Sequence, residues 1–132
     1  MSDTTYACFK RKELMLTIEF YETAEGKCPV DEFMSYLEPK MLAKTLRTID
    51  LLATNGHRLR EPYSAPLKDG LFELRTKMGS DITRIIFFFC VGDKAILTNG
   101  FLKKTRKTPR EEIKLAEKYK KDYERRCHDE QL

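Results

Sequence analysis

Four basic residues occupy positions that surface charge alone explains poorly. Arg75 ends the run "LFELR", Arg84 lies inside the apolar run "ITRIIFFFCV", and Lys103 and Lys104 follow "NGFL". Cations that converge on one place can hold a phosphate and stabilise the charge of a phosphoryl transition state. An arginine in an apolar strand is otherwise costly unless a carboxylate neutralises it, and Glu73 is the candidate partner. A structural salt bridge is therefore the alternative to a catalytic cluster.

Other classes of site find little support in the sequence. There is no glycine-rich phosphate loop, and the four cysteines lack the spacing of a structural zinc site. His57 is a candidate general base, although a single loop histidine is more often a surface residue. No apolar run approaches the ~20 residues of a membrane span, and the N-terminal residues lack the apolar centre of a secretory signal. We therefore expect reduced thiols, no metal or cofactor, no membrane partner and a cytoplasmic location.

Positive charge is concentrated in the last quarter of the chain. The 132 residues carry a formal net charge of +4. Residues 1–102 contain 14 Lys/Arg and 14 Asp/Glu, whereas residues 103–132 contain 11 Lys/Arg and 7 Asp/Glu. Such asymmetry indicates an anionic partner, most often a nucleic acid, although a solvated terminal helix would give the same counts.

The basic stretch leads into a helix expected to begin at Thr108-Pro109, as N-cap and first helical residue, and to end at about Arg126. One side of this helix is apolar and is formed by Ile113, Ala116, Tyr119 and Tyr123. A separate arc, here called the basic ridge, consists of Arg110, Lys114, Lys118, Lys121 and Arg125. The apolar side can pack on the domain while the ridge faces outwards. The ridge either lines a path for phosphates or only solubilises the protein.

Hydrophobic periodicity predicts an α+β domain. Alternating or continuous apolar character indicates strands over residues 14–21, 71–77, 82–91 and 94–101. Helices are expected over residues 30–37 and 39–54, and residues 57–70 are expected to form a loop. The second helix has a predicted buried stripe of Leu42, Leu46, Ile49 and Ala53. The order β-α-α-β-β-β-α favours an antiparallel sheet with an N-terminal helical hairpin on one face and a basic C-terminal helix.

Four segments together resemble a known family: "PLKDGLFELR", "ITRIIFFF", "GFLKKTRKTP" and "EIKLAEKYKKDY". They are similar to the HigB branch of the RelE/ParE toxin superfamily, which includes phage-derived Gp49-like proteins. The resemblance covers residues 15–126, which are expected to form a single RelE-like toxin domain. Residues 1–14 are then an N-terminal extension, and residues 127–132 are a C-terminal tail.

The resemblance implies a toxin of a type II toxin–antitoxin system with a curved antiparallel sheet. Such toxins cleave mRNA, generally in the ribosomal A site, by attack of the RNA 2′-OH on the adjacent phosphate without a metal. A cognate helix-turn-helix antitoxin, HigA-like in this branch, neutralises them. We expect oligomers only through that complex.

By position, the resemblance implies that Arg75 clamps the phosphate in the transition state, with Arg84 and the Lys103/Lys104 pair as further catalytic residues. One of these lysines protonates the leaving 5′-oxygen if neighbouring cations lower its pKa. The implied RNA-binding residues are Lys68, Arg106, Lys107, Arg110, Lys114, Lys118 and Lys121. The sequence places no tyrosine or histidine clearly beside these cations, so it identifies no general base.

Two other functions are compatible with the sequence. A gyrase-directed toxin of the ParE branch would share the fold without needing the basic cluster, and the "KKTRKTP" run argues against it. A non-catalytic RNA-binding or antitoxin-binding protein would use the strand arginines only structurally.

Overall fold

The computed structural model describes residues 15–103 and 107–131 and has α+β architecture, as predicted. In chain order its elements are β1 (Thr17–Phe20), α2 (Pro29–Ser35), α3 (Pro39–Asn55), the 3₁₀ helix η1 (Gly56–Arg58), β2 (Ser64–Pro66), β3 (Leu71–Met78), β4 (Asp81–Cys90), β5 (Lys94–Lys103) and α4 (Arg110–Gln131). None of the helices in these described ranges combines the length and apolar character needed to cross a membrane.

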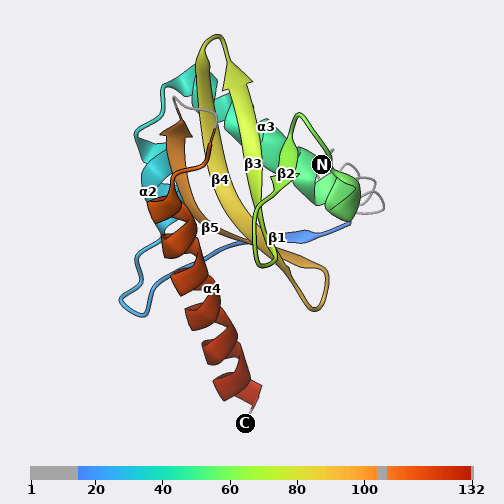
Figure 1. Ribbon diagram of the computed structural model, residues 1–132, viewed down its shortest axis with the longest axis vertical. Coiled ribbons are helices and arrows are strands. Elements are labelled where there is room, and N and C mark those ends of the chain that lie inside the picture. The colour runs from blue at the N-terminus through green and yellow to red at the C-terminus, as the bar shows by residue number, and fades with distance from the viewer. Residues whose placement is uncertain (1–14, 104–106, 132) are drawn as a thin grey trace, which may run out of the picture.

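The strands form a five-stranded sheet in the order β1-β5-β4-β3-β2 (Figure 1). Strands β2 to β5 pair antiparallel, as predicted, whereas β1 pairs parallel with β5, so the sheet is mostly antiparallel. The chain between β1 and β5 passes through α2, α3 and strands β2 to β4, which gives the long connection that a parallel pairing requires. Strand β2 lies within the expected loop 57–70, and its three residues, one of them a proline at the sheet edge, are too few to show a period.

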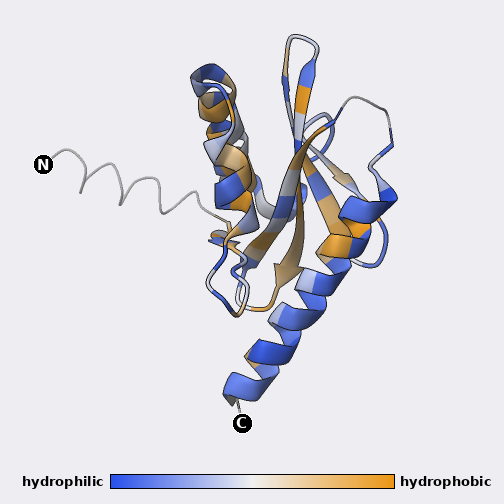
Figure 2. Cartoon of the chain, turned by 90° about the vertical axis from the view of Figure 1, so that its left-hand side faces the viewer, coloured by the Kyte–Doolittle hydropathy of each residue, from blue (hydrophilic) through white to orange (hydrophobic). Residues whose placement is uncertain are grey.

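Helices cover both faces of the sheet. Viewed from the side, α2 and α3 lie against one face and α4 lies against the other (Figure 2). The first core includes Leu52 and Phe87, which are fully buried between the sheet and α2 and α3. The second core includes Ile86 and Phe88, against which Ala116 and Tyr123 of α4 pack. The predicted apolar side of α4 is thus confirmed, and the sheet has two solvent-excluded faces.

The buried face of α3 differs from the predicted stripe. Leu46 is 44% exposed, although the spacing of apolar residues places it in the core. Thr45 is fully buried instead, and its hydroxyl lies 3.2 Å from that of Thr83 on β4. A hydrogen-bonded hydroxyl can be buried at little cost. Helix α3 therefore packs a face that includes Thr45 against the sheet and leaves Leu46 exposed.

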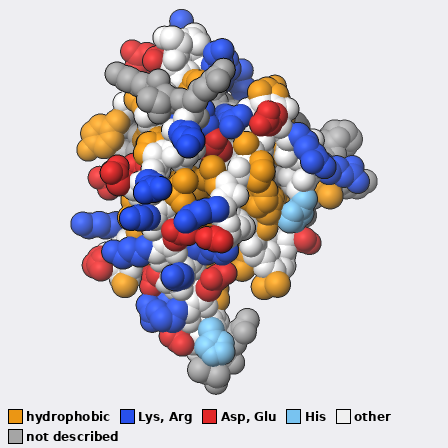
Figure 3. Space-filling view, in the orientation of Figure 1, with side chains coloured by type: hydrophobic (Ala, Val, Ile, Leu, Met, Phe, Trp, Pro, Cys, Tyr) orange, Lys and Arg blue, Asp and Glu red, His pale blue; other side chains and the backbone are white. Residues whose placement is uncertain are grey.

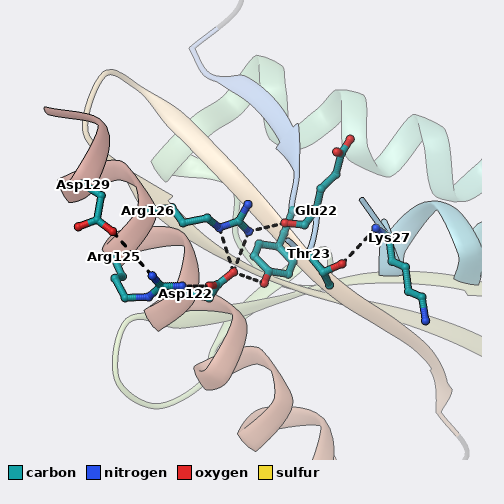
Figure 4. Close-up of polar contacts among 8 residues, drawn as sticks. Glu22, Thr23, Lys27, Asp122, Arg125, Arg126 and Asp129 are labelled. Atoms are coloured by element: carbon teal, nitrogen blue, oxygen red, sulfur yellow. Dashed lines mark hydrogen bonds and ion pairs between the residues drawn. The ribbon is translucent and has the colours of Figure 1, made fainter. Parts of the chain in front are cut away.

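Helix α4 is held to the sheet by a polar cluster as well as by its apolar side. It runs from Arg110 to Gln131, so it continues beyond the predicted end at Arg126. The Tyr21 hydroxyl donates to Asp122 Oδ2 at 2.5 Å, and Arg126 donates to the same carboxylate and to the backbone carbonyl of Glu22 (Figure 4). These hydrogen bonds attach the second half of α4 to the segment that follows β1.

Asp122→Asn is expected to weaken the attachment of α4. The Tyr21 hydroxyl holds the pKa of the Asp122 carboxyl below its usual value of 3.8, and Arg125 and Arg126 act in the same direction while burial opposes them. A depressed carboxyl pKa stabilises the fold above the unfolded-state pKa, and this contribution is lost as pH falls through the folded-state pKa. Urea midpoints of wild type and variant should differ at pH 7 and converge well below pH 3.8.

Asp129→Asn is the matched control, because Asp129 is an exposed acid of the same helix whose contact with Arg125 spans 3.7 Å. Its midpoint at pH 7 should equal that of wild type. Equal midpoints for all three proteins at pH 7 would contradict the role of Asp122.

Candidate functional site

The carboxylate of Glu73 joins three segments that are distant in sequence. The β3–β4 register places Arg75 opposite Arg84, and Glu73 lies two residues before Arg75 on the same face of β3. Glu73 Oε1 accepts hydrogen bonds from Arg75 Nε at 3.1 Å and Nη2 at 3.0 Å, and another from Arg84 Nη1. Glu73 Oε2 accepts from the Thr108 hydroxyl at 2.6 Å, just before α4. The predicted structural salt bridge therefore exists, and it includes both strand arginines.

The members of this cluster differ in exposure. Glu73 and Arg84 are 2% and 5% exposed, and Lys103 is 4% exposed. The side chain of Arg75 is 28% exposed, and its Nη1 also lies 3.7 Å from the solvated carboxylate of Glu61. The buried carboxylate of Glu73 thus holds Arg75 in place, while part of the Arg75 guanidinium stays exposed and can bind a ligand.

Lys103 on β5 lies close to Arg84 on the neighbouring strand β4 and to Arg75 on β3, one strand further. Lys103 lies two residues after Phe101 on β5, and Phe101 pairs with Arg84 in the β4–β5 register. Burial lowers the pKa of the Lys103 amine, and the positive charges of Arg84 and Arg75 lower it further, while Glu73 opposes them. Burial is likewise the main cause of a lowered pKa at Arg84. A lysine with a lowered pKa agrees with the condition predicted for a proton donor.

A basic cavity of about 660 Å³ opens beside this cluster, between the β2–β3 connection and the start of α4. Glu73 and Thr108 line it together with five of the predicted site residues: Lys68, Arg75, Lys107, Arg110 and Lys114. Lysine and arginine side chains gather over this face of the molecule (Figure 3). The N-terminal end of α4 adds the positive end of the helix dipole. The cavity therefore has the electrostatic character of an anion site.

Other predicted residues lie away from this cavity. Lys118 and Lys121 are exposed further along α4 and do not line it. The whole predicted ridge, Arg110, Lys114, Lys118, Lys121 and Arg125, is exposed as expected. Lys104 and Arg106 lie outside the described residues. Helix α4 starts at Arg110, one residue after the predicted first helical residue, Pro109.

A tyrosine lies beside the strand arginines, contrary to the prediction. Tyr63 lines a second cavity together with Arg75 and Arg84. Its backbone carbonyl accepts a hydrogen bond from Arg75 N at 2.7 Å, which continues the β2–β3 pairing. The sequence could have placed Tyr63 beside Arg75 only by predicting β2, which has just three residues. His57, the predicted candidate base, lies instead against Phe89 at a ring separation of 3.9 Å and lines neither cavity.

Within the two described ranges, no group of three or more His, Cys, Asp or Glu side chains is placed to hold a metal ion. The groups that are brought together are guanidinium, ammonium and hydroxyl donors around one carboxylate. Such donors can bind an anion and stabilise negative charge that develops on it.

Glu73→Gln is expected to destabilise the fold by about 3–5 kcal/mol, because it leaves buried cations without their shared carboxylate. Glu61→Gln is the matched control: its side chain is 72% exposed and lies 3.7 Å from Arg75, so its effect should stay below about 1 kcal/mol. Urea unfolding at pH 7 measures both. A Glu73→Gln protein as stable as Glu61→Gln would show that the buried pairing contributes little.

Comparison with known proteins identifies the family. A search of curated proteins finds no match. Residues 32–121 match the profile of the family described as phage derived protein Gp49-like (DUF891). This match includes β3, β4, β5, both strand arginines and the first half of α4. The chain therefore belongs to the Gp49-like family of phage-derived proteins, which is a family of RelE/HigB-type toxins.

Proposed function

We propose that the protein is the toxin of a type II toxin–antitoxin system and cleaves mRNA on the ribosome by a metal-free reaction. Family membership supports the toxin class. The observation that carries the catalytic proposal is the position of Arg75, which is fixed by Glu73 and faces the basic cavity. The mechanism needs positioned cations around one phosphate, and this cavity supplies them.

In this proposal the scissile phosphate of the RNA binds at Arg75. The guanidinium hydrogen-bonds the non-bridging oxygens, and these contacts strengthen as negative charge grows during attack by the adjacent 2′-oxygen. The attack forms the bond from the 2′-oxygen to phosphorus and breaks the bond to the 5′-oxygen, while the 2′-hydroxyl proton passes to water. Lys68, Lys107 and Lys114 surround the cavity and bind neighbouring phosphates. Glu73 keeps Arg75 in one orientation, so that little reorganisation is required when the RNA arrives.

Arg84 and Lys103 have supporting roles in the proposal. Lys103 is the candidate donor of a proton to the leaving 5′-oxygen, because its lowered pKa makes the ammonium a stronger acid. Since Lys103 is 4% exposed, this step requires RNA binding to open the cluster. Arg84 is buried and adds positive charge close to Arg75.

The proposed partners follow from the same surfaces. The exposed ridge of α4 suits the phosphates of ribosomal RNA, because Lys118 and Lys121 continue the charge of the cavity along the helix. A helix-turn-helix antitoxin of the HigA kind would neutralise the toxin by covering the cavity or by keeping it away from the ribosome. Oligomers are proposed to form only through that complex.

Expression without the antitoxin should arrest growth, and Arg75→Ala should relieve the arrest. Loss of one preorganised donor costs about 100-fold or more in rate. Primer extension should show codon-phased mRNA ends after induction of wild type and few after induction of the variant. Arg47→Ala is the control, because Arg47 is an exposed arginine of α3 that lines neither cavity near Arg75. It should arrest growth as wild type does.

Three results would reject the mechanism. An Arg75→Ala protein that folds and stays as toxic as wild type would show that the site is elsewhere. Accumulated DNA breaks with intact mRNA would indicate a gyrase-directed toxin. Salt-sensitive RNA binding without cleavage, on or off ribosomes, would indicate a binding protein.

A further inference from the structure

A second cavity lies on the α3 side of Arg75. It has a volume of about 340 Å³ and is lined by Lys44 and Thr48 of α3, by Tyr63 before β2, and by Arg75, Ile82 and Arg84 of the sheet, among others. Arg75 lines both cavities, so a phosphate bound at its guanidinium would have the basic cavity on one side and this cavity on the other. The volume is within the range of sites that bind small organic groups.

The two cavities differ in chemistry. Five cations line the basic cavity and four line the second cavity, but only the second has an aromatic residue, Tyr63, which lies beside Pro62 and Ile82. Tyr63 is 43% exposed, which leaves ring surface available for contact with a ligand. A planar aromatic ligand suits such a wall, because stacking on tyrosine requires only a π face.

Arg84 lines this cavity as a buried arginine. Its side chain is 6% exposed, and Nη1 donates to Glu73. Among the described residues, no acceptor lies within hydrogen-bond distance of Arg84 Nε. Because Nε has almost no exposed surface, Arg84 adds positive charge beside the cavity and no hydrogen bond to a ligand.

We propose that the second cavity binds one base of the RNA whose phosphate lies at Arg75. This proposal rests on the proposed function, because it takes the phosphate at Arg75 as its starting point. The base stacks on the exposed ring of Tyr63, in the cavity that Arg75 also lines. Arg75 thus joins a phosphate site to a base site, and the protein itself contributes to the choice of nucleotide beside the cleaved bond.

The test uses the full chain and fluorescein-labelled trinucleotides with 2′-O-methyl riboses, which lack the attacking hydroxyl and stay intact. One trinucleotide is complete, and three others are each abasic at one position. Fluorescence anisotropy at fixed salt gives the dissociation constants. One of the three abasic probes should bind wild type about five- to 150-fold more weakly than the complete probe, as expected for loss of one stacked base.

Variants of Tyr63 assign that loss to the second cavity. Tyr63→Ala should bind the complete probe as weakly as wild type binds the sensitive abasic probe, and should lose nothing further with that abasic probe. Tyr63→Phe keeps the ring and should bind as wild type does. Tyr36→Ala is the control, because Tyr36 is 82% exposed and lines neither cavity at Arg75. Its dissociation constants should equal those of wild type.

Three outcomes overturn the proposal: no saturable binding of the complete probe, equal binding of all four probes, or a Tyr63→Ala loss of the same factor with complete and abasic probes. Failure of the proposed function is seen separately. Codon-phased mRNA cleavage in cells with base-independent binding would remove the base site and leave the endonuclease. Base-dependent binding without any cleavage would keep the base site and reject the endonuclease.

Discussion

The candidate site depends on the hydrogen bonds around the carboxylate of Glu73. Glu73 is the one acid among the buried residues of the described chain, and it faces Arg75, Arg84 and Lys103. Its contact with Thr108 also ties the start of α4 to β3. Because buried charges are tolerated only when they are paired and hydrogen-bonded, this carboxylate allows cations inside an apolar sheet. It leaves positive charge in excess locally, which favours an anion in the adjoining cavity.

Much of this arrangement could be predicted from the sequence, because the relevant signals are local. Strands β3, β4 and β5 have strong periodicity and short connections, so their antiparallel pairing follows and brings Arg75 opposite Arg84. The apolar side of α4 and its exposed cations follow from helical spacing alone. Glu73 was predicted as a partner for Arg75, since two residues along one strand share a face. The roles of these residues in catalysis stay predictions.

The parts that could not be predicted depend on tertiary contacts. Leu46 is exposed because Thr45 is buried instead and pairs with the hydroxyl of Thr83 across the first core. The hydropathy of single residues carries no information about such a pair. The parallel pairing joins β1 to β5, which lie far apart in sequence with two helices and three strands between them. Tyr63 enters the second cavity because β2 pairs with β3, and three residues with a proline give no periodic signal. Local pattern therefore identified the charged residues but missed the aromatic one beside them.

The position of α4 links stability to the proposed chemistry. Its second half is fastened by Tyr21 and Asp122, far along the helix from the cavity, while its first turns supply Arg110 and Lys114 to the basic wall. Repulsion among these cations would push the first turns outwards, and the Thr108–Glu73 hydrogen bond and the distant attachment both oppose that movement. The same helix that completes the second core thus brings positive charge close to Arg75. A phosphate bound there would relieve the repulsion, so the site is stabilised most when its proposed substrate is present.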